Sequence, residues 1–163
     1  MVYMDNHQKI GGAVITFGVL ALIFFTFMTV ILPKVVRPTT ELNLGNGVFK
    51  ASIALNEAER MKGLSGVTKM SSDEALIMAY KYESRWKIWM KDIKIPLDII
   101  WLDQTKKVIY IVKNAVPEDS TTKTFEPKGL AAYVVELPAG SVKANSIDIG
   151  QVADFKLKES DIR

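Results

Sequence analysis

The sequence predicts a mainly β domain with short helices, behind one apolar N-terminal segment. Residues 10–32 form a run of 23 residues without a charged side chain. Apolar and polar side chains alternate over 48–55 and 85–91, which is typical of strands that bury one face. The runs 97–102 and 108–113 are largely apolar on both faces, as expected of strands inside a sheet.

The apolar run Ile10 to Leu32 predicts a membrane anchor. As a helix it is long enough to cross a hydrocarbon core of about 30 Å. It ends at Pro33-Lys34 without the small-residue pair of a signal-peptide cleavage site. The flanking Lys and Arg residues slightly favour a cytoplasmic C-terminal side, whereas a short tail (1–9) before one compact domain favours export. We predict a single-pass protein whose domain lies outside the cytoplasm.

The rest of the chain divides at a turn. We expect residues 33–46 to be an extended linker that includes Pro38 and ends at the turn signal Gly45-Asn46-Gly47. The soluble domain is predicted over 47–157, and residues 158–163 form a C-terminal tail.

The first elements of the domain are a strand and a short helix. Residues 48–55 predict a half-buried strand, followed by a helix over Glu57 to Lys62. Asn56 is placed to cap the amide of Glu59, and Gly63 stands where a left-handed residue ends a helix. Further strands are predicted at 75–80, 131–137 and 152–157, with a helical turn at 141–145.

The alternating segment 85–91 holds two of the three tryptophans. One face, assigned to the core, carries Trp86, Ile88 and Met90. The other, expected to face solvent, carries Lys87, Trp89 and Lys91. An aromatic side chain between two cations could stack on a ring or hold an anion. Alternatively, a loop covers Trp89 and the lysines extend around it.

Three charged residues stand out in the predicted domain. Asp98 lies in a strongly apolar strand, where a carboxylate is costly unless it is paired or hydrogen-bonded. Lys91, Arg60 or backbone amides could partner it, or it braces a loop. Glu136 shares a strand face with apolar residues and is expected to be sheltered. Arg60 is either a solvated or ion-paired residue or a positioned functional cation.

Composition excludes several functions. The chain has no cysteine, and its single histidine, His7, precedes the apolar segment. A disulfide, a cysteine nucleophile, a histidine-ligated zinc or a serine–histidine triad is therefore excluded from the domain. Residues 38–163 hold 18 basic and 17 acidic side chains, so no nucleic-acid partner is expected. No phosphate loop, dinucleotide fingerprint or metal-ligand spacing is present, and we predict no cofactor and no metal.

Several separate pieces of the chain resemble a known family in their order and spacing. They are Arg60-Met61-Lys62-Gly63-Leu64, Ala75-Leu76-Ile77-Met78, Ile88-Trp89-Met90-Lys91, Ile95-Pro96-Leu97-Asp98-Ile99-Ile100, Tyr133-Val134-Val135-Glu136 with Ala139-Gly140, and Ile147-Asp148-Ile149-Gly150. Over about residues 47–157 the chain resembles the domain of unknown function 192 family of bacteria and archaea. The resemblance implies a compact, mostly antiparallel β-barrel-like domain with short helices, often exported behind a signal or anchor. It implies no established activity.

The resemblance also implies a set of site residues. The family's recurring polar positions fall on Arg60, Lys91, Asp98 and Glu136, beside Trp89 and Gly63. The chain departs from the family pattern at Ile88, where an aromatic residue is usual, at Asp92, where Asn is usual, and at Gln151, where Asp is usual. The last two departures would alter the polarity of a shared pocket.

Three functions are compatible with these residues. We favour a membrane-anchored binding or accessory module for an envelope glycan, lipid head group or peptide, with a cleft walled by Trp89 and lined by the four polar residues. The first alternative is a hydrolase that uses Asp98 and Glu136 as an acid–base pair and Lys91 or Arg60 as stabiliser. The second is a protein-docking module anchored by Trp89. The sequence predicts no oligomeric state, and we favour a function other than catalysis.

Overall fold

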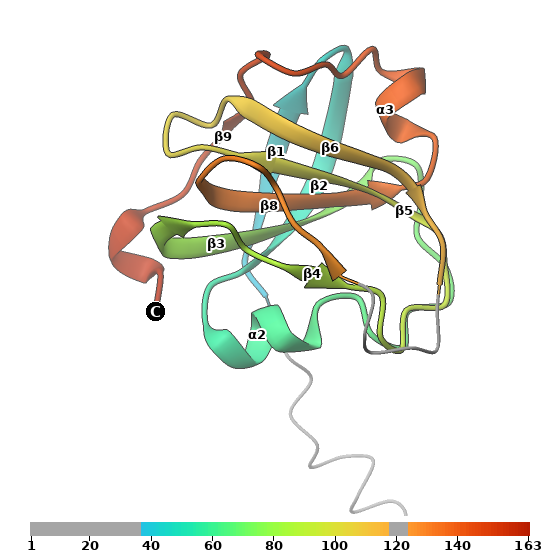
Figure 1. The fold of residues 1–163 in the computed structure, drawn as a ribbon, viewed down its shortest axis with the longest axis horizontal. Helices are drawn as coiled ribbons and strands as arrows, with labels where there is room; N and C mark the ends of the chain where they lie inside the picture. Colours follow the sequence, from blue (N-terminus) through green and yellow to red (C-terminus); the bar gives the residue numbers. More distant parts are fainter. Residues whose placement is uncertain (1–36, 118–123) are drawn as a thin grey trace, which may run out of the picture. The chain divides into compact units, whose positions relative to one another are not determined.

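One curved sheet dominates the computed structural model, which describes residues 37–117 and 124–163 (Figure 1). Within these residues, seven strands pair in the order β6-β5-β8-β3-β2-β1-β9, and β4 pairs with β7 in a separate ribbon. The strands are β1 (Thr39–Leu44), β2 (Gly47–Ala54), β3 (Glu74–Ser84), β4 (Ile88–Trp89), β5 (Leu97–Leu102), β6 (Val108–Ala115), β7 (Thr124–Phe125), β8 (Ala131–Pro138) and β9 (Asp154–Phe155). The helices are α2 (Glu57–Lys62), α3 (Ser141–Ala144) and the 3₁₀ turn η1 (Glu159–Asp161). The prediction of a mainly β domain with short helices is confirmed.

The helix α2 begins and ends where the sequence predicts. Asn56 Oδ1 accepts a hydrogen bond from the amide of Glu59 at 2.9 Å, and Gly63 ends the helix with φ of 47°. The Glu59 carboxylate reaches back to the amide of Leu55 at 2.7 Å, one residue before the cap. These contacts satisfy amides that a short helix would otherwise leave free. They fix α2 as the connection between β2 and β3.

The register places Glu136 in the middle of the sheet. Its strand, β8, lies between β3 and β5, and Glu136 is opposite Leu76 on one side and Ile99 on the other. Side chains directly opposite each other across neighbouring strands share a face of the sheet. Glu136 therefore projects from the same face as Leu76 and Ile99.

The two faces of the sheet each carry a hydrophobic cluster. One cluster includes Phe49, Ile53, Ile77, Ile100 and Leu137. The other includes Leu76, Met78, Ile99, Trp101 and Val134. Because successive residues of a strand point to opposite faces, a strand buried on both sides is apolar throughout. This explains the apolar runs of β5 and β8.

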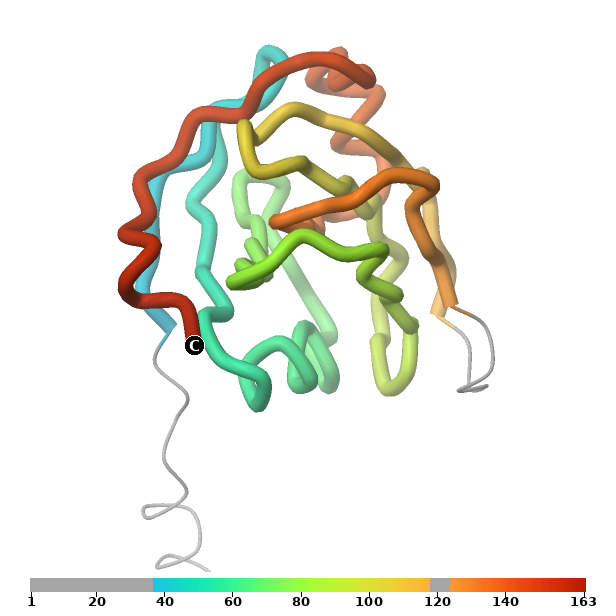
Figure 2. Tube along the Cα trace, turned by 60° about the vertical axis from the view of Figure 1, so that its left-hand side comes forward, coloured from blue at the N-terminus to red at the C-terminus, as the bar shows by residue number. Residues whose placement is uncertain are grey.

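The expectation of a barrel is wrong, because the sheet is not closed. Its edge strands are β6 and β9, and β9 pairs with β1 at only two positions. The edges approach each other through the isolated bridge between Lys107 and Val152. Figure 2 shows the strong curvature that brings the C-terminal segment over this side of the sheet. A two-residue edge strand is too short to complete a ladder around the domain.

The structure also differs from the sequence analysis at two segments. The predicted linker 33–46 contains β1, which pairs with β2 from Thr39 to Leu44 and belongs to the sheet. The alternating segment 85–91 is a strand only at Ile88–Trp89. Arg85 and Lys87, which come just before this strand, take part instead in a network of side-chain contacts described below.

The predicted membrane anchor, residues 10–32, and the tail 1–9 lie outside the described residues. Within the parts of the chain that the structure describes, no helix is both long and apolar enough to cross a membrane.

Candidate functional site

A pocket of about 600 Å³ is bordered by residues of α2, β3, β4 and β8. We call it the Glu136 pocket. It is lined by Glu57, Arg60, Met61, Lys62, Gly63, Leu64, Ser65, Met78, Tyr80, Trp86, Lys87, Ile88, Trp89, Ile93, Thr124 and Glu136. In Figure 1, α2 and β4 lie next to each other on the same side of the sheet. Most of the lining is apolar, which is typical of small-molecule sites.

Glu136 is the most deeply buried charged group of the pocket. Its side chain is 2% exposed, and Oε2 has no hydrogen-bond partner among the described residues. Burial raises the pKa of Glu136 to about 7, although the positive charge of Arg37 lowers it in part. A buried polar atom without a partner is costly. Glu136 therefore exchanges its proton near neutral pH and has an oxygen available to a hydrogen-bond donor.

Tyr80 and Trp86 form one wall of the pocket. Their rings stack with centroids 4.0 Å apart and planes 13° apart. The Arg60 guanidinium lies over the same Tyr80 ring, 5.0 Å from its centroid. Burial raises the pKa of Tyr80 to about 12, with Arg60 opposing and Glu136 adding to the shift. Tyr80 is thus a neutral, firmly packed phenol at physiological pH.

Trp86, which the sequence assigned to the core, is partly buried against one hydrophobic cluster and also lines the pocket. Its backbone carbonyl accepts a hydrogen bond from Trp101 Nε1 at 2.9 Å. Its own indole Nε1 is buried without a hydrogen-bond partner among the described residues. Alternation alone cannot distinguish a core tryptophan from one that borders a cavity, so the sequence held no signal for this role.

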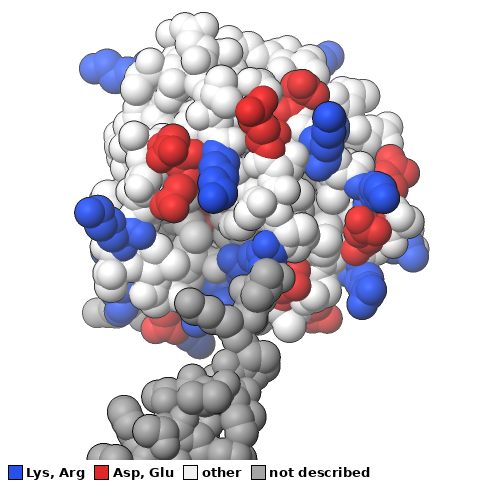
Figure 3. Space-filling model, turned by 180° about the vertical axis from the view of Figure 1, so that it is seen from behind, with Lys and Arg blue, Asp and Glu red and all other residues white. Residues whose placement is uncertain are grey.

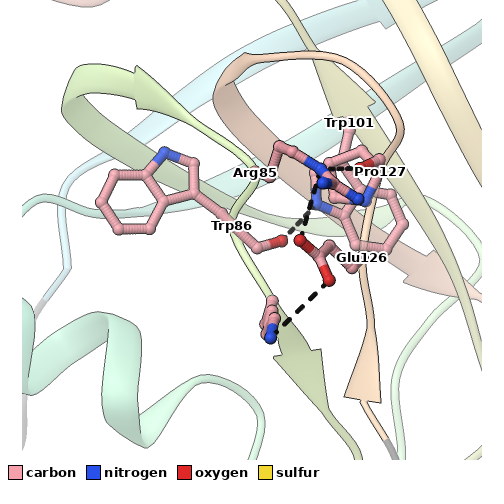
Figure 4. A network of polar contacts seen from close by, with 6 residues as sticks. Arg85, Trp86, Trp101, Glu126 and Pro127 are labelled. Carbon is pink, nitrogen blue, oxygen red and sulfur yellow. Dashed lines mark hydrogen bonds and ion pairs between the residues drawn. The ribbon is translucent and has the colours of Figure 1, made fainter.

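A polar network holds the backbone on either side of Trp86. Arg85 Nε lies 3.3 Å from Glu126 and donates to the carbonyl of Pro127 at 3.0 Å, while Lys87 Nζ lies 3.7 Å from the same carboxylate. Figure 4 shows the Trp86 indole pointing away from Arg85, Glu126 and Pro127. The network and the Trp101 hydrogen bond therefore direct the indole toward Tyr80.

Arg37 is a second residue that the sequence analysis missed. Its Nη2 donates to the carbonyls of Glu59 and Gly63, at 2.8 and 3.0 Å, at the end of α2. Its Nε is buried without a partner in the described residues, and burial lowers its pKa while Glu59 and Glu136 oppose that shift. The sequence placed Arg37 in the linker, and only contacts far along the chain reveal it.

Three buried side-chain atoms lack partners within the described residues, and they are related in space. They are Arg37 Nε, Trp86 Nε1 and Glu136 Oε2. Trp86 and Glu136 line the pocket, and Arg37 interacts electrostatically with Glu136. Unsatisfied buried polar groups are rare in folded proteins and cluster where function requires them.

The pocket unites four of the six predicted site residues: Arg60, Gly63, Trp89 and Glu136. Trp89 is half-buried in β4 and is not sealed in the core. The Arg60 guanidinium donates to the carbonyls of Ala79 and Arg163, at 2.9 and 3.0 Å. Arg60 therefore holds α2 against the middle of β3 and the C-terminal segment while it borders the pocket.

The other two predicted residues lie elsewhere. Lys91 is exposed and does not line the pocket. Asp98 is 1% exposed and accepts hydrogen bonds from the amides of Asn114 and Val142, both at 2.8 Å. Asp98 is opposite Leu137, so it projects from the sheet face opposite to that of Glu136. The two carboxylates therefore do not form an acid–base pair.

Within residues 37–117 and 124–163, no group of three or more His, Cys, Asp or Glu side chains could hold a metal ion. On the face shown in Figure 3, basic and acidic side chains are interspersed.

Comparisons with known proteins extend the sequence resemblance. The model of the DUF192 family, described as "Uncharacterized ACR", matches residues 40–155. A crystal structure of a proposed transcription regulator from Sinorhizobium meliloti 1021 superimposes with a TM-score of 0.71 at 23% identity, covering 75% of this chain and 97% of that one. A protein of unknown function from Novosphingobium aromaticivorans gives a TM-score of 0.66 at 24% identity, covering 76% and 89%. At these identities the two structures show a shared fold alone. The comparison with curated proteins gives no match.

Proposed function

The chain belongs to the DUF192 family of uncharacterised proteins, and from the site itself we propose that it is a binding module that holds a small ligand in the Glu136 pocket. The observation that carries this proposal is Glu136 itself, a carboxyl group that is 2% exposed yet has an unpartnered oxygen in an otherwise apolar pocket. A folded protein tolerates such a group where a ligand completes its hydrogen bonds.

The walls of the pocket support binding of an apolar ligand body. Trp86, Trp89 and Met78 border the cavity, and aromatic and thioether side chains provide adaptable contact surface. The volume of about 600 Å³ lies within the range of known ligand sites. The buried Trp86 Nε1 adds a hydrogen-bond donor beside this apolar surface.

The arrangement favours binding over hydrolysis. A glycosidase-like mechanism needs two carboxylates flanking one bond, separated by about 5–9.5 Å on the same side. Here Glu136 and Asp98 project from opposite faces of the sheet, and Asp98 is occupied by two backbone amides. Asp98 therefore does not serve as the second carboxylate of an acid–base pair with Glu136.

We place the ligand at the cell envelope, because the sequence predicts that residues 10–32 anchor the chain in a membrane with the domain outside the cytoplasm. Accessible classes there are glycans, lipid head groups and peptides. Protease protection of a C-terminal tag in intact cells tests this orientation: digestion from outside supports it, and full protection contradicts it.

Binding is tested directly with the full-length chain in a non-ionic detergent. Monosaccharides, amino sugars, phosphoethanolamine, phosphocholine, simple aromatic amines and short peptides are titrated while tryptophan fluorescence and indole N–H shifts are recorded. We expect at least one class to saturate a site that perturbs Trp86 and Trp89.

The matched variants are Met78→Trp, which fills the pocket beside Tyr80, and Val48→Trp, which adds the same side chain at an exposed position outside the pocket. Met78→Trp should abolish binding and Val48→Trp should leave it unchanged. Flat titrations across the whole panel, or binding that survives Met78→Trp in a folded protein, would overturn the proposal.

A further inference from the structure

The charges around the Glu136 pocket indicate what kind of ligand it takes. Resting on the proposed function, we infer that the ligand is a protonated amine on a compact apolar body, whose ammonium group donates to Glu136 while its body packs against Trp86 and Trp89. The inference depends on the unpartnered Oε2 of Glu136, on the aromatic walls, and on how the neighbouring cations are engaged.

Two of the three basic side chains that line the pocket, Arg60 and Lys87, are engaged by protein groups, and the third, Lys62, is an exposed residue in the last turn of α2. The Arg60 guanidinium is held by the carbonyls of Ala79 and Arg163 and lies over Tyr80. Lys87 pairs with Glu126. These cations are therefore directed toward protein groups and are poorly placed to receive an anionic ligand.

Arg37 attracts Glu136 electrostatically, but no ion pair joins the two side chains. Among the described residues, Arg37 donates through Nη2 to two carbonyls of α2, and neither its Nε nor Glu136 Oε2 has a partner. The guanidinium is thus fixed to the helix and leaves Oε2 for another donor. A ligand ammonium group supplies the missing hydrogen-bond donor and brings a positive charge into direct contact with Oε2.

The aromatic lining is also suited to a cation. The faces of tryptophan and tyrosine rings attract ammonium groups, and such contacts are strongest where water is excluded. Tyr80 already stacks on Trp86 and lies next to the Arg60 guanidinium. Trp86 and Trp89 are therefore the aromatic rings that contact the ligand.

Binding should depend on pH, because Glu136 must be ionised to pair with an ammonium group. Burial raises the pKa of Glu136 to about 7, whereas an alkylammonium group, like that of lysine, keeps its proton up to about pH 10. Affinity should therefore rise as pH rises through about 7. The other charged or titratable groups that line the pocket are Glu57, Arg60, Lys62, Tyr80 and Lys87. Arg37 acts electrostatically on Glu136 and is itself influenced by Glu59.

Three probes of nearly equal shape test the inference on the full-length chain: phenethylamine, 2-phenylethanol and 3-phenylpropionate. Dissociation constants are measured by calorimetry at about pH 8 and about pH 5.5. At the higher pH we expect phenethylamine to bind about tenfold or more tightly than the alcohol, because a hydrogen bond between charged groups is stronger than one between neutral groups. At the lower pH this preference should shrink to about twofold.

The variant Glu136→Gln removes the charge and should abolish the preference for the amine without preventing binding of the alcohol. Its matched control is Glu41→Gln, an exposed carboxylate on β1 that does not line the pocket, which should keep the preference within about twofold. If the alcohol or the propionate binds as tightly as the amine, or if the preference survives Glu136→Gln, the amine assignment is wrong while the pocket stands as a binding site. If none of the probes binds and the wider panel is also flat, the amine assignment and the proposed function both fail.

Discussion

Asp98 and Glu136 are two buried carboxylates on neighbouring strands, and their surroundings are opposite in kind. Asp98 accepts two backbone hydrogen bonds of 2.8 Å, from Asn114 at the end of β6 and from Val142 in α3. Glu136 lies one register position away on β8 but projects from the other face of the sheet, with Oε2 unpartnered and its pKa raised to about 7.

The difference shows why burial alone does not identify a functional carboxylate. A charge whose lone pairs are filled by protein amides stabilises the fold, because those amides would otherwise be buried without acceptors. A charge left without partners at a cavity reduces stability and is retained where a ligand completes it. Asp98 belongs to the first kind, and Glu136 belongs to the second.

The largest expected effect is that of Asp98→Ala on stability. The substitution leaves the amides of Asn114 and Val142 without acceptors and should lower the free energy of unfolding by about 3–5 kcal/mol. Urea denaturation followed by circular dichroism measures this. Asp98→Asn, which retains one acceptor, should lose less. A loss below about 1 kcal/mol for Asp98→Ala would remove the distinction between the two carboxylates.

Glu136→Gln should instead increase the free energy of unfolding above neutral pH. The folded-state pKa of about 7 exceeds the ordinary value of 4.5, so the folded protein binds the proton more tightly than the unfolded chain does. Stability of the wild type therefore falls as pH rises from about 4.5 through about 7, by about 3 kcal/mol in total. The variant lacks this loss and should exceed the wild type in stability at about pH 8.

The measurement is the difference between wild type and Glu136→Gln in urea denaturation at about pH 5 and about pH 8. Other groups that titrate between these two pH values contribute equally to both proteins and cancel. A difference that does not change with pH would show that Glu136 does not titrate near neutrality.

Arg37→Met tests the link between Glu136 and α2. Removing the guanidinium should raise the pKa of Glu136 further, because the attraction of Arg37 lowers it. Loss of the two hydrogen bonds to the carbonyls of Glu59 and Gly63 should also cost about 2 kcal/mol of stability. A carbon-detected pH titration of the Glu136 carboxyl group measures the first effect. Arg37→Lys, which keeps the charge, should move that pKa less; an unchanged pKa in both variants would contradict the link.

Much of the fold could be predicted because its signals are local. The alternation over residues 48–55, the cap at Asn56 and the stop at Gly63 depend on contacts within a few residues. Whether the sheet closes into a barrel could not be predicted in this way. It depends on how many residues of β9 pair with β1, and sequence patterns do not determine the length of such a long-range ladder.

The site was predicted only in part for a related reason. The family resemblance pointed to Glu136, Arg60, Gly63 and Trp89, which line one pocket. It could not separate Asp98 from Glu136, because the sheet face on which each side chain lies depends on the pairing of β5 with β8. Arg37 was missed because its partners are 22 and 26 residues away in the chain.

The smallest effect on stability is expected from Glu126→Gln. The same variant tests whether the sheet face that carries Glu136 and the face that carries Asp98 respond independently. The ion pairs of Glu126 with Arg85 and Lys87 are partly exposed, and such pairs contribute about 0.2–1 kcal/mol. Because they flank Trp86, their loss should weaken binding of phenethylamine severalfold while the surroundings of Asp98 on the other face stay unchanged. The amide chemical shifts of Asn114 and Val142 report on the face that carries Asp98. The control variant is Asp154→Asn, an exposed change on β9. Shifts at those two amides as large as those at the Trp86 indole would mean that the two faces do not respond independently.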